Sequence, residues 1–330
     1  MPGAIIAVIA TGVLCVSVSI FKGATARMHP LYGSRPFHLL LNVSKSPLWW
    51  AGLFVAGIGL ALEYVTLSTM PLTAAAPPFA AGFIVLLVIA LGVYGERLAG
   101  REWAGLGLFA VAGAMVALSV VPGQHADSAL PSLDQVLVIA IPSILIPVIL
   151  FSFGDLKPAG RHARPIGGVA YGLSIGTLTG IGEVAVKGLV IWYDSGGHDP
   201  LSLVTEPYVY LIIAGPGLAI FQMQIALQRC RMAIVFSVAT VMAQVYMLSM
   251  APLLYGESWS TEPVWVLLRI GGLVLAVVAF VFYPHYDHPV VRVGRAEPAA
   301  VPRDEPPVRP SSRSGEQEAE PVYVDFDFSW

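Results

Sequence analysis

Nine predominantly apolar stretches follow one another along the chain, and each is about long enough to cross a lipid bilayer. A membrane-spanning helix requires about 20 consecutive apolar residues, and nine segments meet that condition: 3–22, 48–67, 71–95, 102–121, 135–153, 166–191, 207–227, 232–255 and 263–283. Only 12% of the residues are charged, against about a quarter in soluble domains. The sequence therefore predicts an all-α integral membrane protein with about nine transmembrane helices.

Basic residues are distributed unevenly between the connections. The first, third, fifth and seventh connections and the segment after the last apolar stretch contain Lys or Arg, whereas the other four contain neither. Because cytoplasmic loops are enriched in Lys and Arg, this pattern predicts a plasma-membrane protein with its N-terminus outside and its C-terminus in the cytoplasm. The outer connections carry acidic residues, which either concentrate cations there or reflect an avoidance of exported positive charge. The net charge of -3 argues against a nucleic-acid partner.

Two halves of the chain repeat the same short motifs in the same order. "SIFKG" ends segment 3–22 and "VAVKG" lies in segment 166–191, while "YGE" follows segments three and eight at Glu96 and Glu257. A glycine-containing apolar segment comes after each Tyr-Gly-Glu motif. The first, third and fourth segments thus match the sixth, eighth and ninth, and an offset of five crossings inverts the second copy. In inverted repeats, solutes bind at the repeat interface near the middle of the membrane.

The expected fold class is therefore two inverted four-helix repeats joined by a connector helix. Residues 1–122 are predicted to form the first repeat, 123–165 the connector helix and its loops, and 166–284 the second repeat. Residues 285–330 are rich in Pro, Glu, Ser and Arg, which predicts a disordered cytoplasmic tail. The tail ends in the acidic and aromatic "YVDFDFSW", either a docking peptide for a protein partner or a tail without one. The two cysteines are expected to be free thiols.

The segment "SPLWWAGLFVAGIGLALEYVTLSTMPLTAAAPPFAAGFIVLLVIALGVYGERLAGREWAGLGLFAVAGAMVAL" resembles the drug/metabolite transporter (DMT) superfamily, with its EamA-like fold. This segment, "GTLTGIGEVAVKGL" and "FQMQIALQRC" are similar in particular to the NIPA-type magnesium transporter branch. The resemblance covers residues 3–283. It implies a secondary transporter that carries Mg²⁺ or another divalent cation. Ile225 stands where that branch has a lysine, and the acid of the second apolar stretch is Glu63, three residues after Leu60.

Ionisable residues within spanning helices are candidates for function. Glu63 either lines a cavity or reaches the interfacial water, and as a cavity residue it suits proton coupling or cation binding. Glu63 lies 33 residues before Glu96, the acid of the first Tyr-Gly-Glu motif. The residue 33 positions before Glu257, the acid of the second motif, is Gln224, which is therefore the predicted counterpart of Glu63 in the second half. Glu183 and Lys187, at i and i+4, share one helix face. They form either a structural ion pair or a switch in which a cation or proton displaces Lys187 from Glu183. Arg269 is expected to reach Glu63 or Glu183.

Prolines and glycines interrupt two apolar segments. Pro77 and Pro78 lie in one and Gly215 and Pro216 in the other. The prolines remove backbone hydrogen bonds, and these breaks serve either packing or gating near a cavity.

The expected ion- or substrate-binding residues are Glu63, Glu183, Lys187, Gln222 and Gln224, with Glu63 and Glu183 as metal ligands. The first functional expectation is a divalent-cation carrier that works by alternating access. The alternatives are a proton-coupled exporter of a small polar metabolite or drug, in which Lys187 binds an anionic substrate, and a non-transporting partner of an envelope assembly. No enzymatic activity and no cofactor are expected. The expected partners are the lipid bilayer, the transported ion or small molecule, a second copy of the chain and a protein bound to the tail.

Overall fold

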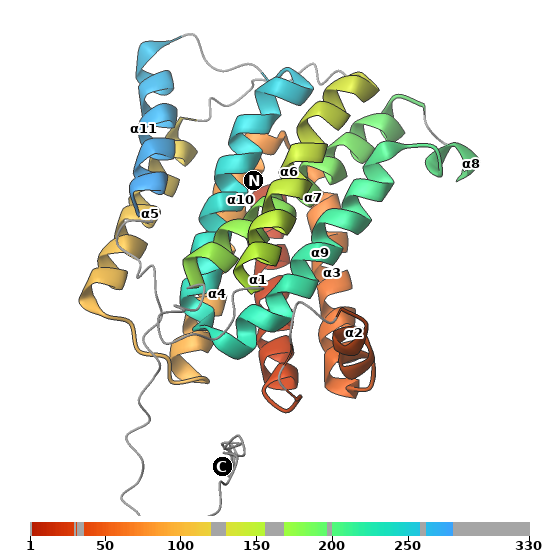
Figure 1. The fold of residues 1–330 in the computed structure, drawn as a ribbon. Coiled ribbons are helices and arrows are strands. Elements are labelled where there is room, and N and C mark those ends of the chain that lie inside the picture. The colour runs from red at the N-terminus through yellow and green to blue at the C-terminus, as the bar shows by residue number, and fades with distance from the viewer. Residues whose placement is uncertain are drawn as a thin grey trace, which may run out of the picture. The chain divides into compact units, whose positions relative to one another are not determined.

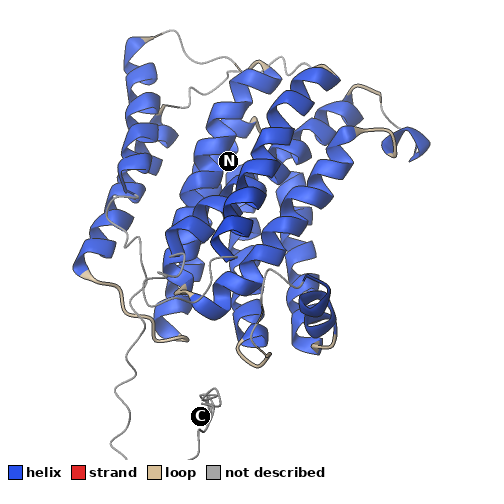
Figure 2. Cartoon of the chain, viewed as in Figure 1, coloured by secondary structure: helices blue, strands red, loops and turns tan. Residues whose placement is uncertain are grey.

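The computed structural model describes residues 2–29, 31, 36–119, 130–155, 168–196, 200–257 and 262–279, and every regular element within them is a helix (Figure 2). Met1–His288 form one unit, and Pro289–Trp330, which include most of the predicted tail, lie outside the described residues. Eight of the helices are long and apolar enough to cross a membrane: α1 (Pro2–Thr25), α3 (Pro47–Thr69), α4 (Leu72–Gly92), α5 (Gly100–Leu118), α6 (Leu133–Asp155), α7 (Gly168–Asp194), α9 (Pro207–Arg229) and α10 (Met232–Tyr255). These eight agree with the sequence-based segments. The ninth segment corresponds to α11 (Pro263–Ala279), which has 17 described residues.

Two short helices were not expected from the sequence. α8 (Pro200–Leu203) is a single turn. α2 (Pro36–Ser44) has nine residues, too few to be detected as a membrane span. It buries Leu39 and Val43, four residues apart, and exposes Leu40 and Leu41, so it packs along one narrow face.

The spanning helices form two sets with the same packing partners. α1 packs against α3 and α4, and α7 packs against α9 and α10. α4 packs against α10, and α5 against α11, so both contacts join a helix of the first half to one of the second. Figure 1 shows α5 and α11 side by side at one flank of the bundle. Close approach depends on small residues: a Cβ on Gly176 of α7 would lie 2.3 Å from the carbonyl oxygen of Ala239 in α10.

A turn after α4 fastens the end of α1 to the start of α10. Gly95 has φ +61°, in the left-handed region that favours glycine. The carboxylate of Glu96 then accepts hydrogen bonds from Lys22 Nζ (2.6 Å) and from the backbone N–H groups of Met232 (2.7 Å) and Ala233 (2.8 Å). The first N–H groups of a helix lack partners within it. α10 has no side-chain cap of its own, and Glu96 satisfies two of these groups.

An equivalent turn after α10 caps the start of α4. Gly256 has φ +63°, and the carboxylate of Glu257 accepts from the backbone N–H groups of Leu72 (2.6 Å) and Thr73 (2.9 Å). α4 also lacks a side-chain cap of its own. Each Tyr-Gly-Glu turn therefore caps the helix that precedes the other turn.

A tyrosine in each turn joins it to the first helix of its own half. Tyr94 donates to the carbonyl of Ser19 in α1 (2.6 Å), and Tyr255 donates to the carbonyl of Val184 in α7. α1 is therefore parallel to α4 and α7 to α10, while α4 and α10 are antiparallel because the end of each lies at the start of the other. It follows that α1 and α7 cross in opposite directions.

Candidate functional site

A cavity of about 180 Å³ lies between the two sets of helices. It is lined by α1, α3 and α4 from the first half and by α7, α9 and α10 from the second. Most of its wall is apolar, and four phenylalanines contribute to it: Phe21, Phe79, Phe83 and Phe236. A space of this volume is large enough for a small organic molecule or several waters, since one water needs only about 10–15 Å³ by the same measure.

Glu63 of α3 and Glu183 of α7 meet in this cavity. Both residues line it, with exposures of 4% and 9%, and their carboxyl groups are close enough to interact with each other. Two carboxylates this close cannot both remain charged, so the pair must share a proton or bind a cation. The second oxygen of Glu183, Oε2, has no hydrogen-bond partner in the described part of the chain. The pair therefore retains a buried acceptor without a partner among these residues.

The two residues expected to act as metal ligands are thus adjacent, but few other side chains nearby could bind a metal ion. Among the described residues, no group of three or more His, Cys, Asp or Glu side chains is placed to hold a metal ion. The cavity wall also includes four hydroxyl side chains and one amide side chain, from Thr11, Ser17, Thr179, Thr240 and Gln244.

Lys187 does not pair with Glu183 as the helical spacing predicted. Its ammonium donates to the carbonyls of Leu67 (2.9 Å) and Met70 (3.2 Å) at the end of α3, where the helix dipole favours a cation. Glu183, one turn earlier, turns instead toward Glu63. Lys187 is not one of the described residues that line the cavity. Spacing along one helix placed the two side chains on a common face but did not determine their partners in other helices.

The two glutamines expected in the site lie outside the cavity wall. Gln222 accepts a hydrogen bond from Ser174 of α7, and Gln224 is 1% exposed in the protein interior. The equivalence of Gln224 with Glu63 stays a prediction, because it depends on where the count begins. α3 and α9 begin at Pro47 and Pro207 and have equal lengths of 23 residues, so counting from these starts pairs Glu63, 16 residues into its helix, with Met223.

The two ways of counting differ by one residue for a structural reason. From the capped N–H of Leu72 to Glu96 is 24 residues, whereas from Met232 to Glu257 is 25, so counting back from the two turns shifts the register by one. Met223 lines the cavity just as Glu63 does. A carboxyl of α3 and a thioether of α9, each 16 residues from the start of its helix, therefore line the same cavity.

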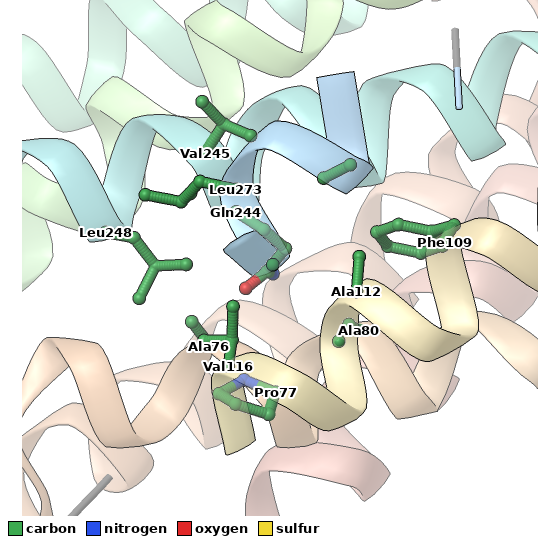
Figure 3. A pocket seen from close by; sticks show the side chains of 13 residues that line it. Ala76, Pro77, Ala80, Phe109, Ala112, Val116, Gln244, Val245, Leu248 and Leu273 are labelled. Carbon is green, nitrogen blue, oxygen red and sulfur yellow. The ribbon is translucent and has the colours of Figure 1, made fainter. Parts of the chain in front are cut away.

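The helix breakers occupy three different surroundings. α4 and α9 continue as helices through their prolines. Pro216 lines the cavity, and Pro77 lines a smaller pocket between α4, α5, α10 and α11 (Figure 3). Gly215 allows α9 to approach α7, since a Cβ there would lie 2.8 Å from the carbonyl oxygen of Leu178. Pro78 lines neither space.

Arg269 of α11 makes a contact that the sequence did not predict. Its guanidinium donates to Oγ (3.2 Å) and to the carbonyl oxygen (3.3 Å) of Ser119, at the end of α5. It was expected to reach Glu63 or Glu183. The observed contact joins α11 to α5, the pair at the flank of the bundle.

Sequence reasoning missed the four phenylalanines and Gln244. The phenylalanines gave no signal, because aromatic residues are ordinary in apolar helices and only the packing shows which of them face a cavity. Gln244 did carry a signal, as an amide in the middle of an apolar helix, of the kind that usually faces a partner or a cavity.

Together these features define a class of molecule. In the described part of the chain every regular element is a helix, eight helices are able to span a membrane, and six of these line a largely apolar cavity that contains two acids. The chain matches no protein-family model, and neither a curated protein nor a solved structure shows significant similarity to it.

Proposed function

We propose that the protein is a secondary carrier that exchanges protons for a small organic cation. The observation that carries this proposal is the contact between Glu63 and Glu183 inside an otherwise largely apolar cavity. A cation can replace the shared proton with little change in the charge of the site. Proton and solute then compete for one pair of carboxyls, and this competition couples their movements.

The character of the wall favours an organic solute over a hydrated metal ion. Mg²⁺ requires near-octahedral oxygen coordination and retains several waters, whereas this cavity offers two adjacent carboxyls and mostly hydrocarbon. Phenylalanine faces attract organic cations through their π systems. An ammonium group with an apolar body satisfies both the acids and the wall.

The two halves are proposed to be inverted repeats that move by alternating access. This is supported by the opposite directions of α1 and α7, by the equivalent packing of the two sets and by the reciprocal caps of Glu96 and Glu257. Inverted repeats rock around a fixed central site and open one end at a time. Opening an end would require its glutamate to release the helix of the opposite half.

The orientation is proposed from the basic residues, with the N-terminus outside and the plasma membrane as location. Glu96 and Lys22 then close the cytoplasmic end, where Arg231 and Glu102 add an ion pair (2.6 Å). Glu257 and Lys187 close the outer end. The two closures differ: Lys22 bonds its glutamate directly, whereas Lys187 bonds carbonyls of α3.

Transport by the purified protein in liposomes tests the proposal. The probe is phenethyltrimethylammonium, a permanent cation that cannot cross the bilayer as a neutral base. Vesicles with an acidic interior should accumulate it, and Glu63→Gln with Glu183→Gln should abolish accumulation. Glu206→Gln, which changes an acid outside the cavity, should preserve it. Absence of pH-driven uptake by the native protein would overturn the proposal.

A divalent-cation carrier is the second candidate, and one observation favours it: the two acids expected to bind the metal are the two that meet. The same vesicles loaded with a Mg²⁺ indicator distinguish the candidates. Magnesium influx that requires both acids, without uptake of the organic cation, would establish the second candidate and reject the first.

A further inference from the structure

Gln244 of α10 stands between two spaces. It lines the central cavity and also the small pocket, of about 20 Å³, between α4, α5, α10 and α11. Figure 3 shows this pocket with Gln244 among apolar side chains, and every other described residue that lines it is apolar or glycine. The amide therefore lies where the wall of the cavity meets the α5–α11 pair.

The amide is buried and incompletely bonded. Gln244 is 8% exposed, and its Oε1 has no hydrogen-bond partner in the described part of the chain. A buried acceptor without a partner destabilises the folded protein, and such groups in native structures call for an explanation. An acceptor that a ligand satisfies when it binds is one such explanation.

The location of Gln244 relative to the acids defines the geometry of a ligand. Glu63 and Glu183 are on α3 and α7, which pack against each other. Gln244 is on the part of the wall that borders α5 and α11. The phenylalanine side chains contribute to the wall of the same cavity. A solute that contacts both the carboxyl pair and Gln244 has a charged end, an apolar body and a hydrogen-bond donor at the other end.

We infer that Gln244 is a specificity-determining contact of the carried solute and binds a hydroxyl group remote from the positive charge. This inference rests on the proposed function, and it narrows the substrate class to organic cations with a terminal hydroxyl. The Oε1 atom has almost no accessible surface in the present conformation, so the amide turns toward the cavity to accept the hydrogen bond of the hydroxyl, while the carboxyl pair binds the cationic end. A solute without the hydroxyl leaves the amide oxygen unsatisfied and binds more weakly.

Two ligands that differ in one group test the inference. Phenethyltrimethylammonium and its 4-hydroxy analogue are titrated separately into the purified protein, and their affinities are compared. The native protein should bind the hydroxylated ligand about tenfold more tightly, the effect of one buried hydrogen bond. Gln244→Leu should reduce this ratio to about one and leave the affinity for the ligand without a hydroxyl within about twofold, which also shows that the variant is folded.

Gln224→Leu is the matched control, because Gln224 is also a buried amide without a hydrogen-bond partner among the described residues, yet lies outside the cavity wall. It should retain the tenfold preference. Equal binding of the two ligands by the native protein, or a preference that survives Gln244→Leu, would overturn the inference and leave the carrier intact. If the native protein binds neither ligand, the proposed function fails, and the inference fails with it.

Discussion

The reciprocal helix caps give a prediction whose size follows from the structure. Glu257 is 3% exposed and accepts two backbone N–H groups at the start of α4. A hydrogen bond to a charged group contributes about 1.5–3 kcal/mol, and an abandoned buried donor adds a penalty. Glu257→Ala should therefore lower the free energy of unfolding by about 3–5 kcal/mol. Glu257→Gln keeps an oxygen that accepts one of the two bonds, so about half of that loss is expected.

Glu96 should be the more sensitive of the two acids. Its carboxylate accepts from Lys22 as well as from two N–H groups of α10, so Glu96→Ala also leaves a part-buried ammonium without its acid. We expect a loss about 1–2 kcal/mol larger than for Glu257→Ala. Because the two caps lie at opposite ends of α4 and α10, their effects should add within about 0.5 kcal/mol.

The assay is reversible unfolding by SDS in mixed micelles, followed by far-UV circular dichroism. Glu206→Ala serves as the control, because Glu206 stands at the N-cap of α9 without a side-chain capping bond. It should change stability by less than about 0.5 kcal/mol. Equal losses for Glu206→Ala and Glu257→Ala, or no loss for Glu257→Ala, would refute the argument that the acids fasten one half to the other.

Three further predictions concern packing and the cavity. Gly176→Ala should destabilise the fold by about 1–3 kcal/mol in the same SDS titration, because its Cβ would meet the Ala239 carbonyl. Gly57→Ala should not destabilise it, because no atom lies within 4 Å of the added Cβ. Equal effects of the two substitutions would contradict the described packing of α7 against α10. In a Cys230→Ser background, bound phenethyltrimethylammonium should slow alkylation of Cys15, which lines the cavity, and an unchanged rate would place the ligand elsewhere. Ser174→Ala should cost about 1 kcal/mol of stability through its bond to Gln222 and leave the affinity for this cation unchanged; a changed affinity would show that Gln222 contributes to the site.

The spanning helices were predictable because length and apolarity alone determine them. Eight segments correspond to helices of the expected length, since a bilayer requires about 20 apolar residues whatever their packing. α2 has only nine residues and is stabilised by tertiary contact, so this rule could not detect it. The Tyr-Gly-Glu motifs were visible as repeated letters, but their capping of the opposite half depends on the turn that Gly95 and Gly256 allow.

The site was predictable only in part. Hydropathy identifies Glu63 and Glu183 as acids within apolar helices, and both lie in the cavity. Their contact with each other could not be derived, because the i, i+4 spacing directs attention to Lys187 within the same helix, whereas the actual partner comes from another helix. The pairing of Gln224 with Glu63 stays a prediction, because α10 contains one residue more than α4 between its capped end and its glutamate, so the result depends on where the count begins.

If a cation and a proton compete for the Glu63–Glu183 pair, then binding of the cation must release protons, and this release can be measured. Phenethyltrimethylammonium is added to the purified protein in a weakly buffered solution that contains a pH indicator. We expect release of about one proton for each cation bound, tighter binding as the pH rises, and no release from the Glu63→Gln, Glu183→Gln double variant. Binding without proton release, or equal release from the double variant, would contradict it.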